Sequence, residues 1–323
     1  MRTFKEDIFD LLLGKRGGHT QKWLYADHAR PVGILSGSAL WHDFVTANRN
    51  YYPIQSEIDM IPALVRSLAL DFDTVVDFGI GDTKALHHKT KPILRAQKRL
   101  ERYYPIDISN DNLETGLHDI RGQFPNIIAR GIQGDFYEKQ SGIEGDKRLG
   151  LFLGTTISNI DMKLEEDFPR AAIVRKLATL AQTVKGDGRG SLVVSFDSNP
   201  DLDHALSAYQ HPSWQRMMTG LMYDVQRLLK PEGKFNPSMW YYEGVIDRKH
   251  RVLHQTIGPS IDQDFTIDGE GFQISKGYRF VVKNNWKPAV DQIYGMIEEA
   301  GLTPKAPVRG DNHPMIMAEA EVV

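Results

Sequence analysis

The feature that most constrains the fold is a regular alternation of short β-rich runs and longer helical patterns between about residues 73 and 197. The β-rich runs span residues 74–78, 102–108, 126–133, 149–153 and 191–196. Helical stretches such as 167–184 separate them, and in these stretches apolar residues recur every three or four positions. Because this alternation puts helices on both faces of a parallel sheet, we predict an α/β fold with a doubly wound sheet.

The alternation breaks after residue 197, which indicates an inserted lobe. Residues 198–286 contain a helical pattern over 214–229 and strand-like runs over 251–257 and 277–282, whereas a helix over 289–300 and a strand over 315–322 would return to the sheet. We predict a Rossmann-like nucleotide-binding domain of residues 62–197 plus 287–323 and a substrate-binding lobe of residues 1–61 plus 198–286. Ligands of doubly wound sheets bind beyond the carboxyl ends of the strands, where this lobe would close over them.

Composition excludes several classes of protein. The chain has no cysteine, so disulfides, thiolate metal sites and a cysteine nucleophile are excluded, and we expect no metal because no carboxylate–histidine string resembles a zinc motif. A net charge of -3 gives no reason to expect nucleic acid or an anionic membrane as partner. Residues 1–18 carry charges where a signal peptide would be apolar, so we predict an amphipathic helix and a cytoplasmic protein.

The sharpest local motif is Val-Val-Asp-Phe-Gly-Ile-Gly-Asp-Thr at residues 75–83, where a predicted strand runs into a turn with two glycines. Glycine lets the backbone take positive φ and approach a ligand closely. A dinucleotide-binding loop would have a third glycine where Lys84 stands, so a nicotinamide site fits poorly. S-adenosylmethionine (SAM) has no pyrophosphate to bind, and we assign Asp77, Gly79, Gly81 and Lys84 to a SAM site.

Acidic residues end the next two predicted strands. Asp107 follows the second strand, where a carboxylate can accept both ribose hydroxyls. Asp135 follows the third, where a carboxylate can accept the adenine amino group while the ring of Phe136 packs on the base. Each acid alone is equally typical of a helix cap, but similar features at three successive strand ends favour SAM.

Over most of its length the chain resembles the histidine-specific SAM-dependent methyltransferases of ergothioneine biosynthesis and their amino-acid-methylating relatives. The resemblance is carried by Lys-Trp-Leu-Tyr at 22–25, Gly-Ser-Ala-Leu-Trp at 37–41, Tyr-Tyr-Pro at 51–53 with Glu57, Gly-Asp-Phe at 134–136, Phe-Leu-Gly-Thr-Thr-Ile-Ser-Asn at 152–159 and Ala-Tyr at 208–209. It implies a class I methyltransferase fold, a Rossmann-like doubly wound sheet with an inserted α+β substrate-binding lobe. It also implies that SAM is bound by Gly79, Asp107, Asp135 and Phe136, with Gly154 nearby, and that an amino-acid acceptor is faced by Tyr25, Tyr51, Asn159 and Tyr209, with Trp41 beside them.

The chain departs from this family at two places. Ser275 stands where the histidine enzymes are expected to carry an imidazole-reading glutamate, and Gly277 stands where a serine would follow. A polar string on the insertion helix is replaced by Met-Met-Thr-Gly at 217–220. Losing a carboxylate that pairs with an imidazole costs on the order of 2–4 kcal/mol in a buried site. Histidine is therefore disfavoured as the acceptor, and Ser275 is assigned to the acceptor site.

The residues that replace these polar groups are apolar, which suggests the acceptor. Trp214, Met217, Met218 and Met222 would form a soft wall suited to a methionine side chain. Relatives of the family include the bacterial methionine S-methyltransferases that begin dimethylsulfoniopropionate synthesis, so we predict S-methylation of methionine. The catalytic candidates are Tyr51, Asn159 and Asp197, the last placed to hold the sulfonium product.

Alternatives remain open at this point. Methylation of an α-amino nitrogen needs an acceptor for the ammonium proton, which Tyr25 or Tyr51 could provide through a water. A NAD-dependent oxidoreductase would share the sheet, and a non-catalytic SAM-binding module would share the glycine turn. The sequence does not fix the acceptor, the number of methyl transfers or the oligomeric state, and a homo-oligomer is compatible with it.

Overall fold

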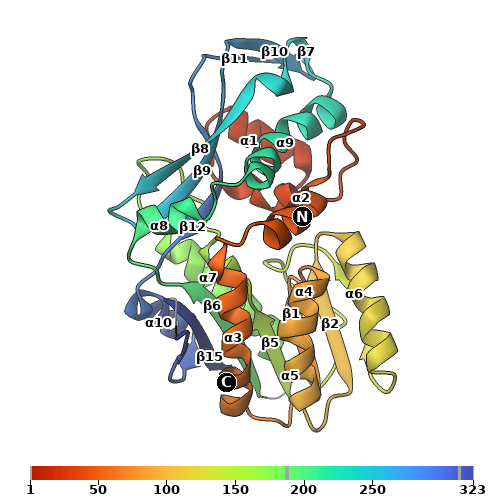
Figure 1. Cartoon of the computed structure of the whole chain (residues 1–323). Helices are drawn as coiled ribbons and strands as arrows, with labels where there is room; N and C mark the ends of the chain where they lie inside the picture. Colours follow the sequence, from red (N-terminus) through yellow and green to blue (C-terminus); the bar gives the residue numbers. More distant parts are fainter. Residues whose placement is uncertain (1, 186–188, 312–313, 323) are drawn as a thin grey trace.

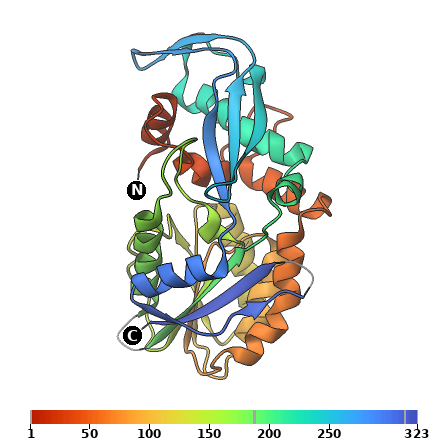
Figure 2. The ribbon, with the colours of Figure 1, turned by 90° about the vertical axis from the view of Figure 1, so that its left-hand side faces the viewer.

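In the computed structural model, which describes residues 2–185, 189–311 and 314–322, a large sheet flanked by helices carries a second lobe above one end (Figure 1). The same arrangement is seen from the side in Figure 2, where strands of the lobe descend toward the sheet. The two parts meet at a cavity that residues of both line. This arrangement positions the candidate site.

The nine-stranded sheet has the order β13-β15-β6-β5-β1-β2-β3, with β4 paired to β2 and β14 to β15. Neighbours among β1, β2, β5 and β6 run parallel, whereas β15 lies antiparallel to β6. The strands are β1 (Thr74–Phe78), β2 (Arg102–Asp107), β3 (Ile128–Ala129), β4 (Ile132–Gln133), β5 (Arg148–Phe152), β6 (Gly190–Asp197), β13 (Leu302–Pro304), β14 (Val308–Arg309) and β15 (Met315–Val322). The strand order reverses between β1 and β5, and doubly wound sheets bind ligands at such a point.

Of the five strands predicted between residues 73 and 197, four are confirmed with ends that differ by at most one residue: β1, β2, β5 and β6. The strand predicted over 315–322 is confirmed as β15. The fifth, predicted over residues 126–133, is divided into β3 and β4. Gly131 lies between these two halves, and a Cβ placed there would approach Leu117 Cδ1 to 2.8 Å. The chain therefore breaks its pairing where it passes close to a helix.

Helices cover both faces of the sheet because successive strand residues point to opposite sides. Val75 of β1 packs in one core with α3 (Tyr52–Ser67), α5 (Lys91–Ala96) and α6 (Asn110–Gln123). Val76 packs in a second core with α7 (Arg170–Lys185) and α10 (Val290–Glu299). Short helical segments connect these elements: α4 (Thr83–Ala85), the π-helix η2 (Leu86–Thr90) and η3 (Thr156–Ser158).

The lobe combines helices with two small sheets. Its helices are α1 (Phe4–Leu12), η1 (His19–Tyr25), α2 (Gly37–Ala47), α8 (Leu202–Ser207), α9 (Pro212–Leu229) and η4 (Pro237–Met239). One sheet has the order β12-β9-β8, formed by β8 (Trp240–Asp247), β9 (Val252–Pro259) and β12 (Phe280–Trp286). The other has the order β11-β10-β7, formed by β7 (Glu232–Lys234), β10 (Gln263–Ile267) and β11 (Glu270–Ile274).

The predicted domain boundary at residues 61 and 62 falls inside a helix. α3 runs from Tyr52 to Ser67 and packs against α5 and β15, so the whole helix belongs with the large sheet. Pro62 lies inside this helix. Within the three described ranges of the chain, no helix combines the length and apolar content needed to cross a bilayer.

Candidate active site

The turn after β1 leaves its backbone open toward a cavity. Gly79 has φ of 93° and Gly81 has φ of 68°, conformations that glycine adopts without strain. The Gly79 amide donates a hydrogen bond to the carbonyl of Ile106 at 2.8 Å, which fixes the turn to the neighbouring strand. A Cβ placed on Gly79 would lie 3.8 Å from the Phe136 ring, so the missing side chain leaves room beside that ring.

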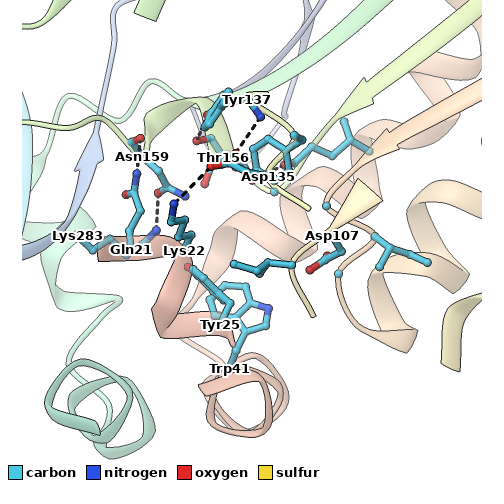
Figure 3. Close-up of a pocket in the computed structure, with 18 of the residues that line it drawn as sticks. Gln21, Lys22, Tyr25, Trp41, Asp107, Asp135, Tyr137, Thr156, Asn159 and Lys283 are labelled. Atoms are coloured by element: carbon cyan, nitrogen blue, oxygen red, sulfur yellow. Dashed lines mark hydrogen bonds and ion pairs between the residues drawn. The ribbon is translucent and has the colours of Figure 1, made fainter. Parts of the chain in front are cut away.

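Asp107 and Asp135 line the same cavity as Gly79 and Phe136, which has a volume of about 410 Å³ (Figure 3). The two acids stand at the ends of β2 and β4, on adjacent positions of the sheet edge. Burial raises the pKa of Asp107 to about 6, although hydrogen bonds from the amides of Ser109 and Gly81 oppose the shift. Above that pH the cavity presents a desolvated carboxylate that would gain from bonding hydroxyl groups.

Asp77 anchors the underside of the turn. Its Oδ2 accepts hydrogen bonds from the hydroxyls of Tyr103 at 2.9 Å and Thr90 at 3.0 Å. Burial raises the pKa of Asp77 to about 6, and these two donors oppose the shift. Asp77 lines the cavity, and its bonds hold β1, β2 and η2 together below the turn.

Glu57 of α3 is a fully buried carboxylate that sequence analysis noted only as part of a motif. Its Oε1 accepts the Gly154 amide at 2.7 Å and also the hydroxyl of Ser195, while its Oε2 pairs with Lys89 at 2.7 Å. Glu57 and Lys89 both line the cavity, whereas the predicted Lys84 does not. Lys89, which follows Lys84 by about one helical turn, is therefore a cation beside the turn, and the assignment of Lys84 to SAM stays a prediction.

Tyr25, Trp41, Tyr51 and Asn159 line the other end of the same cavity (Figure 3). The Trp41 ring packs edge-on against Tyr25 and Tyr51, with centroid separations of 5.5 and 5.9 Å. Burial raises the pKa of both tyrosines, so their hydroxyls stay protonated at neutral pH and can donate to a carboxylate. These residues from η1, α2 and the start of α3 meet Asn159, which follows η3.

Two more residues at this end were not anticipated. Lys283 and Asn285 lie on β12 and line the cavity. The Lys283 ammonium donates to Asn159 Oδ1, and the amide of Gln21 donates to the Asn159 carbonyl at 2.8 Å. The sequence does contain a sign of them, because Lys-Asn-Asn at 283–285 directly follows the strand predicted over 277–282. Polar residues inside a buried strand point to a cavity or a hydrogen-bond network.

Ser275 lies outside the residues that line the cavity, and its assignment to the acceptor site stays a prediction. It is an exposed residue between β11 and β12, whereas the strand that reaches the cavity is β12 itself. At this exposed position Ser275 has no bearing on whether the cavity accepts histidine.

Met218 also lies outside the cavity, because the hydrophobic face of α9 points into the lobe. Met217, Met218 and Met222 are fully buried in its core, and of the predicted apolar wall on this helix Trp214 alone lines the cavity. These methionines follow the helical spacing of core residues.

Tyr209 and Asp197 pack behind the site without lining it. The Tyr209 ring lies against Tyr51 and Trp214, with centroid separations of 5.5 and 4.8 Å. Asp197 is fully buried and pairs with Lys287 at 2.6 Å, so its charge is already neutralised. Their positions support roles in holding the lobe to the sheet, and the assignments of Tyr209 to acceptor contact and Asp197 to catalysis stay predictions.

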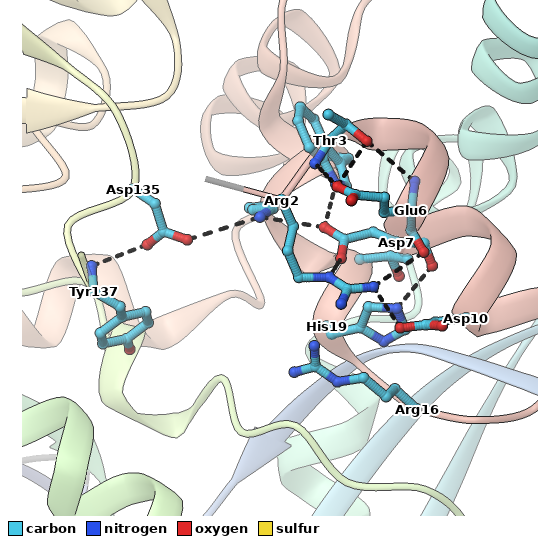
Figure 4. Close-up of polar contacts among 12 residues, drawn as sticks. Arg2, Thr3, Glu6, Asp7, Asp10, Arg16, His19, Asp135 and Tyr137 are labelled. Atoms are coloured by element: carbon cyan, nitrogen blue, oxygen red, sulfur yellow. Dashed lines mark hydrogen bonds and ion pairs between the residues drawn. The ribbon is translucent and has the colours of Figure 1, made fainter.

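The amino-terminal helix is linked to the cofactor end of the cavity (Figure 4). Asp7 of α1 accepts from Arg2 at 2.7 Å and from the Trp23 indole at 2.9 Å. Lys22 of η1 lies 3.2 Å from Asp7 and 3.8 Å from Asp135, whose other oxygen accepts the Tyr137 amide at 2.9 Å. The lobe is thus joined electrostatically to the acid expected at the adenine.

Comparison with known proteins found a matching family over nearly the whole chain and several similar proteins. The family model described as histidine-specific, SAM-dependent methyltransferase matches residues 4–320. The chain is 23% identical to the N-methyltransferase dtpB of Aspergillus flavus over 83% of this chain and 76% of the relative. It is 30% identical to the histidine N-alpha-methyltransferase of Mycobacterium tuberculosis over 64% of this chain and 60% of the relative. A SAM-dependent methyltransferase from Clostridium acetobutylicum is similar in structure at 12% identity and a TM-score of 0.46, covering 88% of this chain and 97% of that one.

The family match and the sheet agree with each other. The parallel strands with their reversal beside β1, and the antiparallel β15 inserted next to β6, give the class I methyltransferase arrangement of a Rossmann-like sheet. The cavity at the reversal is lined by the open glycine turn, the two acids and the aromatic ring that the sequence analysis assigned to SAM. Since the family model covers residues 4–320, the chain is a SAM-dependent methyltransferase and belongs to the histidine-specific SAM-dependent methyltransferase family.

Proposed function

We propose that this enzyme transfers a methyl group from SAM to the α-amino nitrogen of a free amino acid. The observation that carries the proposal is the shared cavity, which joins the strand-tip acids to Tyr25, Tyr51 and Asn159 without a wall between them. The N-methyltransferases among the similar proteins support nitrogen as the accepting atom. A cavity of about 410 Å³ is within the range of small-molecule sites.

The cofactor end fits SAM by its donors and acceptors. Asp107 would accept the ribose hydroxyls, and Asp135 would accept the adenine amino group beside the Phe136 ring. When bound, SAM supplies an electrophilic methyl group on a sulfonium. The open backbone at Gly79 lets that group approach the strand edge, where a side chain would otherwise lie.

The acceptor end fits the carboxylate of an amino acid. Protonated hydroxyls of Tyr25 and Tyr51 and the amide of Asn159 can donate to it, which offsets the desolvation of a buried charge. Fixing the carboxylate orients the adjacent amine toward the methyl group. The α-ammonium first gives one proton to water, which frees the nitrogen lone pair. The neutral nitrogen then bonds the methyl carbon as the bond from that carbon to the cofactor sulfur breaks. The raised pKa of each tyrosine makes a tyrosinate base unfavourable, so the hydroxyls serve as donors.

The test is a panel in which pure enzyme is incubated with SAM and each common amino acid, and methylated products are located by fragmentation mass spectrometry. We expect the methyl group on the α-nitrogen. Asn159→Ala should lower kcat/KM for the acceptor about 10–100-fold, because it removes a hydrogen bond to a charged group, and should leave SAM affinity unchanged. Asn110→Ala, on the exposed start of α6, is the control and should match wild type.

S-methylation of methionine, the product expected from the sequence, is the rival outcome of this panel. It rested on a methionine-rich wall, and that wall is buried in the lobe core. Methionine as the only substrate, with the methyl group on sulfur, would contradict the proposal for nitrogen. Methylation of no amino acid by an enzyme that binds SAM would contradict the proposed acceptor class altogether.

A further inference from the structure

Lys283 differs from the other buried lysines of the chain. Among the described residues, four lysines are buried: Lys89, Lys91, Lys283 and Lys287. Three of them pair with a carboxylate: Lys89 with Glu57, Lys91 with Asp119 and Lys287 with Asp197. Lys283 has no carboxylate within ion-pair distance in the part of the chain that the structure describes.

The surroundings of Lys283 are neutral or positive. Its ammonium donates to Asn159 Oδ1 and lies 5.3 Å from the centroid of the Tyr25 ring. The side chain is 2% exposed and lines the cavity at its acceptor end. Burial, followed by repulsion from Lys287, holds the pKa of Lys283 well below its ordinary value. An anion entering the cavity would supply the missing partner and restore the charged form.

Charge balance indicates which anion is missing. The tyrosine hydroxyls and the Asn159 amide already offer neutral donors to an α-carboxylate. A neutral amino acid is a zwitterion whose single carboxylate these donors already bind, so it would bring no partner for the buried charge of the Lys283 ammonium. A second carboxylate on the acceptor would balance this charge and pair with Lys283.

We propose that Lys283 binds the side-chain carboxylate of the acceptor, so that the substrate is an acidic amino acid. This inference rests on the proposed function, because it names the substrate class of the same site. Asn285, beside it on β12, has its own oxygen engaged by Gln255 at 3.0 Å and is therefore oriented as an additional amide donor.

The test compares acidic amino acids with their uncharged amides. We expect wild-type enzyme to favour aspartate, glutamate or a longer homologue over asparagine and glutamine by at least about tenfold in kcat/KM. Lys283→Met should remove that preference, Lys283→Arg should retain part of it, and both should bind S-adenosylhomocysteine as wild type does. Lys249→Met, at an exposed lysine, is the control and should keep the full preference.

Three results would overturn the inference. The first is a wild-type enzyme that uses neutral amino acids as well as acidic ones, which needs no variant and would leave the proposed function intact. The second is an equal loss for acids and amides in Lys283→Met, which would assign Lys283 to the α-carboxylate. The third is the absence of any methylated amino acid with wild type, which would contradict the proposed function itself.

Discussion

At the scale of one residue, Asp107 lowers the stability of the folded protein and is expected to bind SAM. Its carboxylate ends a buried strand and faces the cavity, and burial raises its pKa to about 6. A raised pKa means that the folded protein binds this proton more tightly than the unfolded chain does. Ionised Asp107 therefore destabilises the SAM-free protein above pH 6, and this effect disappears as the pH falls below the unfolded value of about 4.

Asp107→Asn should accordingly separate stability from binding. At pH 8 without SAM, we expect its melting temperature to exceed that of wild type by about 2–4 °C, because the variant buries no charge. SAM affinity should fall about 10–100-fold because the ribose hydroxyls lose a charged acceptor. Calorimetry at pH 8 and pH 4 measures the direction of the change in melting temperature and the pH range in which it occurs.

The difference in melting temperature should shrink at pH 4, where Asp107 is protonated in the folded protein and about half protonated in the unfolded chain. The exposed Asp264→Asn is the control and should show neither effect. A gain in stability that is equally large at pH 4 would mean that the charge of Asp107 is not its cause.

At the scale of elements, η1 connects the two ends of the cavity. Within seven residues it supplies Lys22 beside Asp135 and Tyr25 at the acceptor end, together with Gln21, which bonds the Asn159 backbone. Asp7 of α1 holds this short helix from behind. Burial alone would raise the pKa of Asp7, but hydrogen bonds from Arg2 and Trp23 and the charge of Lys22 keep it below its ordinary value.

Asp7→Asn should loosen α1 and η1 together. We expect a loss of about 1–3 kcal/mol in unfolding free energy, since a buried carboxylate with charged partners is replaced by an amide. The KM for the acceptor should rise as well, because Tyr25 lies at the end of η1. Urea unfolding and steady-state kinetics measure the two effects.

Asp10→Asn provides a matched comparison on the same helix. Asp10 is partly exposed and pairs with Arg2, so the change should cost less than about 0.5 kcal/mol. Equal destabilisation by the two variants would show that Asp7 has no special role in holding η1.

At the scale of the whole molecule, the sequence was most informative where burial is continuous. β1 and β6 are buried at every position, and such runs predict strands and the turns that follow them. The acids at the ends of β2 and β4 were predicted together because parallel strands bring their carboxyl ends to one edge. The structure does bring Asp107 and Asp135 to one cavity beside Gly79.

The residues that could not be predicted depend on contacts between distant segments. Asp197 is neutralised by Lys287, ninety positions later, and no local pattern shows that pairing. Lys283 lies on a strand whose register against β9 shifts between Val281 and Lys283. Because of this shift, the alternation of inward and outward residues along the sequence does not predict which way Lys283 points. The methionines of α9 have the same spacing whether they line a core or a pocket, and in this protein they lie in a core.

The central claim is that one cavity binds SAM at the strand tips and the acceptor at Tyr25, Tyr51 and Asn159. A crystal structure of the enzyme grown with S-adenosylhomocysteine and its acceptor tests it most directly. We predict density for the ribose hydroxyls at Asp107, for the adenine between Asp135 and Phe136, and for an amino-acid carboxylate at Asn159. Density for either ligand outside this cavity would contradict it.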